Sequence, residues 1–226
     1  PVTFKMRPQT DTVRVTITAI TGASATNTIT FQSENNDSSS VSLRFPTTDT
    51  LNNPNAVVTL DGADYIIFRR ITLERTGPRA YGRVIDFKNN ACYNTITNCR
   101  LIGSTQAISG NSLCAIVYSS AGTPTNDSGN VIGNNRFEYG SIGIYFSGVS
   151  TASPESGTQI LNNLFVDQLS EGIDITCQAN LTLSGNTISN SIYFAGSTGI
   201  KLDRSIREHR IFKNKISGYY NKGISM

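Results

Sequence analysis

The feature that most constrains the fold is a three-residue pattern, one apolar residue on each side of a variable one, that recurs every 24 to 31 residues. Its copies begin at Val58, Ile85, Ile116, Ile144, Ile173, Ile200 and Ile224. A six-residue pattern alternates with it, starting and ending on an apolar residue and often carrying Asn in its middle. Its copies begin at Ile66, Ile96, Ile132, Ile160, Leu183 and Ile211. Such a period indicates one structural unit repeated along the chain.

The repeated unit is a coil of β-strands. Charged residues make up only 15% of the 226-residue chain, and the apolar residues come in short, β-branched or aromatic runs such as "VRVTIT" and "NTITF", as in strands. Strands that recur once per coil without two-residue hairpin turns pair in parallel. Equivalent residues of successive coils then lie about 4.8 Å apart. We therefore predict an all-β parallel β-helix of about seven to eight coils. One internal column of it contains Ile85, Ile116, Ile144, Ile173 and Ile200.

The six-residue pattern places asparagines at a turn between two strands of each coil. Asn tolerates the left-handed backbone region that sharp turns need. Four of them share one position in the aligned copies, namely Asn135, Asn163, Asn186 and Asn214. Stacked on successive coils, their amides can bond to one another and satisfy groups that the turn buries. Cys99 and Arg69 take this position in earlier copies, so the ladder is expected to fade toward the N-terminus.

These repeats resemble the pectin-lyase-like, right-handed parallel β-helix superfamily with its "I-x-N-N-x-I … G-I-x-L" pattern. The likeness is close over residues 57–226 and looser over 1–56, and the stretch 27–73 also resembles coils of large exported bacterial surface proteins. It implies a single-stranded right-handed β-helix forming one domain over 1–226, in a secreted or cell-surface protein. Neither end carries the cap that a solenoid needs. We therefore expect an internal piece of a longer chain, with further coils or partner chains at both ends.

The middle residues of the triplets point outward and form the default binding site. In coil order they are Thr59, Asp86, Val117, Tyr145, Asp174, Lys201 and Ser225. An aromatic ring, a carboxylate and an ammonium group side by side suit a sugar and its carboxylate. We therefore predict that a polysaccharide or surface glycan binds Tyr145, Asp174 and Lys201, together with Asp203 and Asp86.

A catalytic role is the weaker interpretation of the same residues. Asp174 and Asp203, one coil apart, are expected about 6 to 9 Å from each other, which suits an inverting hydrolase. Lys201 beside Asp174 is expected to lower the pKa of that carboxyl, which favours a surface ion pair over a proton donor. The catalytic sets of polygalacturonase-type relatives are missing. Asp86 and Asp174 are about 14 Å apart, too far to share a metal ion, so no metal or cofactor is predicted.

The net charge, the length of the apolar runs and the cysteines limit the partners and cross-links that the chain can have. The net charge of +3 does not indicate a nucleic-acid partner, and no apolar run is long enough for direct membrane insertion. Four cysteines, Cys92, Cys99, Cys114 and Cys177, read as core fillers, with a Cys92–Cys99 disulfide left open. Two long insertions, 119–130 and 147–157, leave adjacent coils at one corner and are expected to form a wall.

The sequence therefore predicts a structural or adhesive β-helix module that presents a carbohydrate-binding strip. The alternative is a polysaccharide lyase or glycoside hydrolase that acts on an acidic polysaccharide along the same strip. A trimeric fibre of the phage-tailspike kind stays open as a third interpretation.

Overall fold

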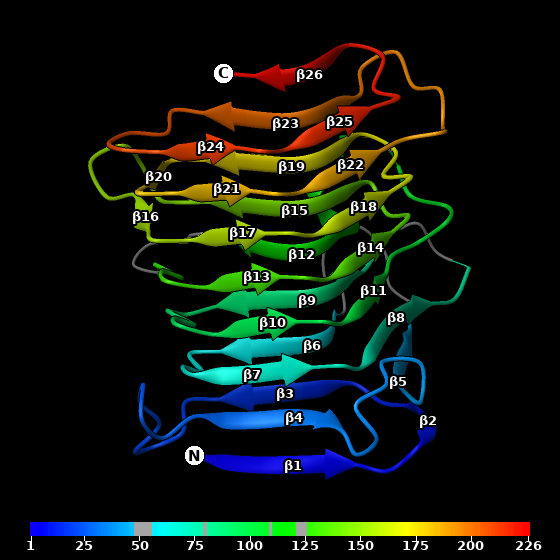
Figure 1. The fold of residues 1–226 in the computed structure, drawn as a ribbon, viewed down its shortest axis with the longest axis vertical. Helices are drawn as coiled ribbons and strands as arrows, with labels where there is room; N and C mark the ends of the chain where they lie inside the picture. The colour runs from blue at the N-terminus through cyan, green and yellow to red at the C-terminus, as the bar shows by residue number, and fades with distance from the viewer. Residues whose placement is uncertain (48–55, 79–80, 109, 121–125) are drawn as a thin grey trace.

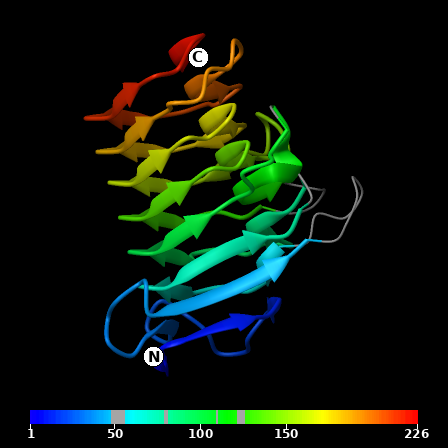
Figure 2. The same cartoon turned by 90° about the vertical axis from the view of Figure 1, so that its right-hand side faces the viewer.

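The chain winds into a right-handed coil of short strands, with its termini at opposite ends of the stack (Figure 1). This computed structural model describes residues 1–47, 56–78, 81–108, 110–120 and 126–226. Three sheets of eight parallel strands run along the axis, and Figure 2 shows the coils stacked from the side. The predicted all-β parallel β-helix and its number of coils are confirmed.

Each coil contributes one strand to each sheet. We call the sheets A, B and C. Sheet A contains β1 (Val2–Met6), β4 (Ile29–Ser33), β7 (Ile66–Arg69), β10 (Thr95–Thr97), β13 (Val131–Gly133), β17 (Gln159–Leu161), β21 (Thr182–Ser184) and β24 (Arg210–Phe212). Sheet B contains β2 (Gln9–Thr12), β5 (Val41–Pro46), β8 (Thr72–Thr76), β11 (Arg100–Ile102), β14 (Arg136–Glu138), β18 (Leu164–Val166), β22 (Thr187–Ser189) and β25 (Lys215–Ser217). Sheet C contains β3 (Val15–Thr18), β6 (Ala56–Asp61), β9 (Arg83–Lys88), β12 (Ala115–Ser120), β15 (Ile142–Ser147), β19 (Glu171–Thr176), β23 (Thr198–Asp203) and β26 (Lys222–Ser225).

Two smaller elements lie outside these sheets. Strands β16 (Glu155–Ser156) and β20 (Gln178–Ala179) pair in parallel at a corner. Of the described residues, only Ser112–Cys114 form a helix, one turn of 3₁₀ type. No helix in the described part of the chain is long and apolar enough to cross a membrane.

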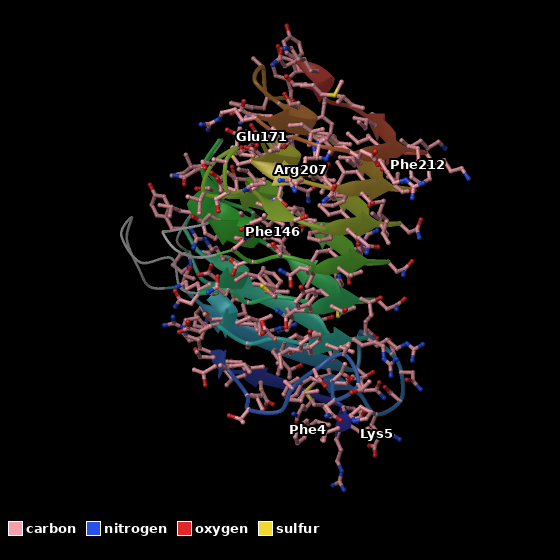
Figure 3. The ribbon with its side chains drawn as sticks, turned by 90° about the vertical axis from the view of Figure 1, so that its left-hand side faces the viewer. Phe4, Lys5, Phe146, Glu171, Arg207 and Phe212 are labelled. Atoms are coloured by element: carbon pink, nitrogen blue, oxygen red, sulfur yellow. The ribbon has the colours of Figure 1, made fainter. Side chains whose placement is uncertain are left out.

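The core is built from columns of identical or similar side chains. In sheet C the register stacks Val58, Ile85, Val117, Ile144, Ile173, Ile200 and Ile224. All but the last are fully buried, and burying one such side chain contributes about 1.5–3 kcal/mol. Figure 3 shows Phe146 within the stack and Phe212 at its outer edge. Stacking of equivalent residues is thus the main source of the stability of the coil.

The predicted column was wrong at one coil, where Val117 and not Ile116 pairs with Ile85 and Ile144. Both Ile116 and Val117 are fully buried, and the run "AIVY" has no polar residue to fix the alternation. The correct register turns Tyr118 outward. Ile116 instead fills the position taken by Gly143 in the next coil, where a Cβ would meet the ring of Phe165.

The register predicted for the first copy of the six-residue pattern was also wrong. Strand β7 pairs with β10 so that Phe68, not Ile66, stacks on Ile96. The copy therefore runs from Phe68 to Leu73, and Ile71 rather than Arg69 takes the ladder position. Arg69 instead hydrogen-bonds Gln32 across to the neighbouring strand.

The turn between sheets A and B contains a continuous ladder of buried amides. The Nδ2 group of Asn135 donates to Oδ1 of Asn163 over 3.1 Å, Asn163 donates likewise to Asn186 over 3.1 Å, and Asn186 to Asn214 over 2.9 Å. At the other end, the backbone N–H of Cys99 donates to Asn135. Each amide also bonds backbone groups, so the ladder satisfies the buried polar groups of the turn at Asn135, Asn163 and Asn186.

The left-handed turn residue is the one before each ladder asparagine. Asn134, Asn162, Gly185 and Lys213 have φ of 57°, 53°, 69° and 56°, and Asn98 before Cys99 has φ of 55°. Where two asparagines are adjacent, as at 134–135 and 162–163, the first adopts the turn conformation and the second makes the ladder.

A polar node interrupts the apolar core at the corner after β12. Ser119 lies in the inward column between Phe87 and Phe146. Its hydroxyl is 2.7 Å from Oδ2 of Asp127 and 3.0 Å from Oε1 of Glu155, and all three residues are fully buried. One hydroxyl hydrogen cannot serve two carboxylates, so the second contact needs a proton on a carboxyl group. Burial raises the pKa of Glu155 to about 7 and also raises that of Asp127, where hydrogen bonds from Ser119 and from two backbone N–H groups oppose the rise. We therefore assign the proton to Glu155.

All four cysteines are free thiols. Cys99, Cys114 and Cys177 are buried and Cys92 is half-buried, so the disulfide left open between Cys92 and Cys99 is not formed. Burial raises the pKa of the Cys99 thiol to about 12, as for an inert core residue.

The two end coils expose apolar side chains. Val2 and Phe4 are 54% and 51% exposed at one end, and Ile224 and Met226 are 44% and 91% exposed at the other. The expectation that further coils or partner chains cover both ends stays a prediction.

The ladder should contribute strongly to stability at its centre. We expect Asn163→Ala to lower the free energy of unfolding by roughly 3 kcal/mol, because it leaves several buried donors and acceptors unpaired. Asn214→Ala, at the half-buried end, should cost roughly 1 kcal/mol, because water can replace the amide there. Urea titration measures both. Equal losses, or none, would contradict the structural role of the ladder.

The Ser119 node should make stability depend on pH. The folded-state pKa of Glu155 lies above its ordinary value of 4.5, so its stabilising effect is complete below about pH 4.5 and is lost as the pH rises through about 7. Glu155→Gln should remove much of this loss, on the order of 3 kcal/mol, because the amide can donate to Ser119 at any pH. Urea unfolding from pH 4.5 to 8.5 measures it, with the exposed Glu34→Gln as control. An unchanged slope in Glu155→Gln would refute the assignment.

Candidate functional site

The outer face of sheet C carries the row of side chains that we call the strip. Its members occupy matching register positions on successive coils and are Thr59, Asp86, Tyr118, Tyr145, Asp174, Lys201 and Ser225. Val117, predicted as a member, faces the core and is replaced by Tyr118. The row runs parallel to the axis, since each strand pairs with the next without a change of register.

Asp174 and Lys201 form an ion pair in the strip, with 3.0 Å between Oδ2 and Nζ. The Asp174 side chain is 6% exposed and that of Lys201 is 43% exposed, so the pair is not the surface contact that the sequence predicted. Burial raises the pKa of Asp174 and outweighs the lowering by Lys201, while the charge of Asp203 adds to the rise. The expected lowering was therefore wrong. Within the described part of the molecule, Oδ1 of Asp174 has no hydrogen-bond partner.

Asp203 lies beside the strip and not in it. It pairs in register with Thr176, so it belongs to the neighbouring outward column. Its side chain is 51% exposed and forms an ion pair with Arg204 at 3.1 Å. The structure therefore separates the buried carboxyl of Asp174 from an exposed one whose charge is already balanced.

Sequence reasoning missed a second carboxyl group beside Asp174. Glu171 opens β19, three residues before Asp174. Burial raises the pKa of Glu171, and the charge of Asp174 adds to this while Lys201 opposes it. Tyr219 is next to this group, because its hydroxyl would be 3.3 Å from a Cβ on Gly172. Neither Oε2 of Glu171 nor the Tyr219 hydroxyl has a hydrogen-bond partner among the described residues.

The two tyrosines of the strip stack on each other along the axis. The rings of Tyr118 and Tyr145 are 5.3 Å apart at 12°, and the guanidinium carbon of Arg83 lies 3.1 Å from the centre of the Tyr118 ring. Their stacked faces are turned toward neighbouring coils. A ligand on the strip therefore meets ring edges and phenol hydroxyls.

Asp86 is neutralised within its own strand. Its carboxylate lies 3.2 Å from Nη1 of Arg83 and 3.2 Å from Nζ of Lys88, and its side chain is only 1% exposed. A buried carboxylate between two cations is a structural support. Asp86 therefore positions Arg83 under Tyr118, and the sequence-predicted contact of Asp86 with a ligand has no exposed atom to make it.

The described parts of the two long insertions contact each other beside the strip. The Asn126 amide donates to the Pro154 carbonyl over 3.4 Å, and the backbone N–H of Ser156 donates to Ser128. Residues 121–125 of the first insertion lie outside the described residues. The adjacent corners meet as predicted in the part of the chain that the structure describes.

The strip and its surroundings offer hydrogen-bonding groups and carboxyl groups with a raised pKa. Within the described ranges, no three His, Cys, Asp or Glu side chains are close enough to share a metal ion. Two carboxyl groups with raised pKa, the buried Asp174 and the half-buried Glu171, lie beside a half-exposed ammonium group, that of Lys201. The phenol of Tyr145 adds a donor on the preceding coil.

Comparison with known proteins supports the fold. Residues 125–226 match the family described as the right handed beta helix region, and no curated protein matches the chain. Among solved structures, pectate lyase Pel9A superposes with a TM-score of 0.59 and 16% identity over 95% of this chain and 52% of that one. An alginate lyase from Paenibacillus sp. str. FPU-7 gives a TM-score of 0.46 and 13% identity over 100% of this chain and 90% of that one.

The reach of these similarities is limited to architecture. The chain spans about half the length of pectate lyase Pel9A, and an identity of 16% speaks for the fold alone. With its three parallel sheets and its matching C-terminal part, the chain has the right-handed parallel β-helix fold that it shares with pectate lyase Pel9A.

Proposed function

We propose that the chain is a rigid module of a secreted or cell-surface protein that binds polysaccharide along the strip. The observation that carries this proposal is the succession of Tyr145, Asp174 and Lys201 on three adjacent coils. Each coil advances the row by about 4.8 Å, so a linear polymer lying along the axis meets a new polar group at every step. A stacked solenoid is suited to such an extended binding surface.

The charges favour an acidic polysaccharide. Lys201 is the half-exposed cation of the row, and Asp174 holds its ammonium group in place. The remaining ammonium hydrogens can bond a sugar carboxylate, while the phenol of Tyr145 can bond a hydroxyl. A neutral sugar offers the ammonium group only hydroxyl oxygens, which form weaker hydrogen bonds with it than a carboxylate does.

A second candidate is cleavage of such a polysaccharide by a lyase or hydrolase. The observation in its favour is that burial raises the pKa of both Asp174 and Glu171, which is the direction of shift that a carboxyl group acting as a general acid needs. Incubation with a panel of polyuronates, followed by reducing ends and by the absorbance of unsaturated products, separates the two functions. Turnover that is lost in Asp174→Asn would establish cleavage, and binding without turnover would establish the binding module.

The binding proposal predicts a specific role for Lys201. Lys201→Met should weaken binding of an oligouronate about tenfold, because a charge-assisted hydrogen bond contributes about 1.5–3 kcal/mol. Lys88→Met is the matched control, since the Lys88 side chain is 44% exposed and also pairs with a buried Asp of the strip, Asp86, but four coils away from Lys201 and outside the succession of Tyr145, Asp174 and Lys201. Calorimetric titration measures both variants, with thermal unfolding as a check of the fold. Equal weakening in the two variants would remove the strip as the binding site.

A further inference from the structure

A hollow lies on the outer face of sheet B, away from the strip. It has a volume of about 400 Å³ and spans the coils of β5, β8, β11 and β14. We call it the arginine pocket, after Arg44, Arg75 and Arg100 in its lining.

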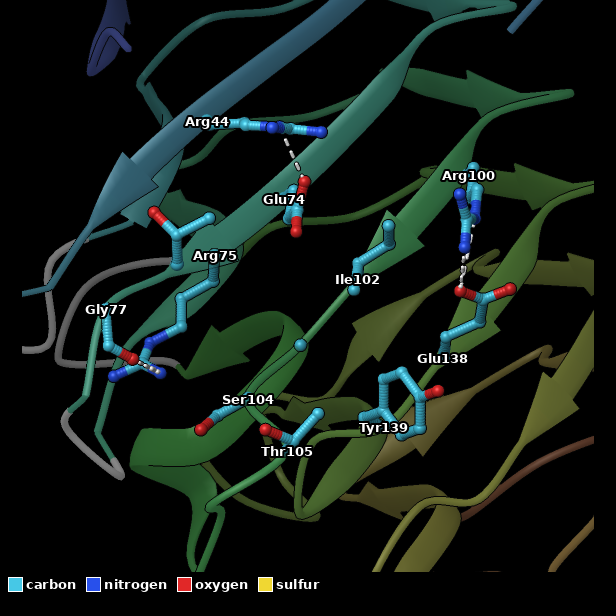
Figure 4. A pocket seen from close by; sticks show the side chains of 12 residues that line it. Arg44, Glu74, Arg75, Gly77, Arg100, Ile102, Ser104, Thr105, Glu138 and Tyr139 are labelled. Atoms are coloured by element: carbon cyan, nitrogen blue, oxygen red, sulfur yellow. Dashed lines mark hydrogen bonds and ion pairs between the residues drawn. The ribbon is translucent and has the colours of Figure 1, made fainter. Parts of the chain in front are cut away.

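Two ion pairs form the walls of the pocket. Arg44 pairs with Glu74 at 2.7 Å, and Arg100 pairs with Glu138 at 2.6 Å. Figure 4 shows these pairs on two sides of the hollow, with Tyr139 at its far end. The pocket is thus lined by charged groups from four successive coils, which the parallel register places side by side.

Cations exceed anions in this pocket. Three guanidinium groups stand against the carboxylates of Glu74 and Glu138, and Glu138 also pairs with Arg136 outside the lining. Burial alone would raise the pKa of Glu138, but Arg100 and Arg136 outweigh burial and lower this pKa. The Glu138 carboxyl is therefore kept ionised.

Arg44 and Arg100 have donors that are free to bind a ligand. The contacts of Arg44 with Ser42 and Glu74 use its Nε atom, and those of Arg100 with Glu138 use Nε and Nη2. The outer guanidinium nitrogens of Arg44 and the Nη1 of Arg100 have no partner among the described residues. Both side chains are nearly half exposed, so an anion can reach them. Arg75 donates to the carbonyls of Gly77 and Tyr81 and so fixes the wall of the pocket.

The far end of the pocket combines apolar side chains with one carboxylate, Asp167, which accepts hydrogen bonds from Ser191. Tyr139, 39% exposed, lies at the junction with a small hollow of about 40 Å³ that Ala107, Leu169 and Ile192 help to line. Ser104 and Thr105 border both hollows. Guanidinium groups, hydroxyls and an aromatic ring in one row match the carboxylate, hydroxyl and C–H faces of a sugar acid.

We propose that the arginine pocket is a second glycan-binding site, which takes a carboxylated sugar unit of an anionic polysaccharide lying along the outer face of sheet B. It goes beyond the proposed function, because it uses a different sheet and none of the residues of the strip. An acidic peptide could pair with the arginines equally well, but it would make fewer contacts with the row of hydroxyls and with Tyr139.

The test titrates trigalacturonate into Lys201→Met protein, in which the strip is weakened, and follows binding by calorimetry. Adding Arg44→Gln or Arg100→Gln should weaken the remaining binding at least tenfold. Arg136→Gln is the matched control, since Arg136 is 48% exposed like Arg100 and pairs with the same Glu138 but lies outside the lining. It should change the affinity by less than threefold. Thermal unfolding checks the fold of each variant.

Three results would overturn the inference. They are remaining binding that Arg44→Gln and Arg100→Gln leave unchanged, an equal loss in Arg136→Gln, and equally tight binding of a neutral trisaccharide or of triglutamate. The strip is judged separately, by comparing Lys201→Met with Lys88→Met in otherwise unaltered protein. Failure of one site is therefore distinguishable from failure of the other.

Discussion

Parallel pairing without change of register is the constraint on which the rest of this structure depends. It places every side chain about 4.8 Å from its equivalent in the next coil, so each position of the repeat becomes a column along the axis. Where the column is apolar it is core, as for Ile144 and Ile173. Where it is Asn it is a ladder, as for Asn163 and Asn186. The outward columns are left to carry function, and they vary from coil to coil.

The same constraint brings charged groups together. Asp174 meets Lys201 because they share a register position, and the two arginines at Glu138 come from paired strands. Because sheets B and C face different sides of the coil, the molecule has two candidate binding surfaces. The strip has buried carboxyl groups and one half-exposed cation, whereas the arginine pocket has a surplus of guanidinium groups. Both surfaces run along the axis, which suits a linear polymer.

The fold could be predicted from the sequence because its period is written in the apolar pattern. The register was predicted wrongly where apolar residues follow one another and no longer alternate with polar ones. In "AIVY" the two consecutive core residues Ile116 and Val117 concealed the phase, and with it the outward position of Tyr118. The burial of Asp174 and the roles of Glu171 and Arg83 depend on contacts between coils, and local spacing does not encode them. The Ser119 node joins residues from three segments and has no motif of its own.

The register itself can be measured directly by native-state labelling of introduced thiols. Tyr118→Cys and Val117→Cys are treated with a thiol reagent, and the modified peptides are identified by mass spectrometry. The structure predicts that the thiol at position 118 reacts rapidly in the folded protein, while the thiol at 117 reacts only as fast as the protein unfolds. The reverse order would contradict the register, and with it the composition of the strip and of the core column.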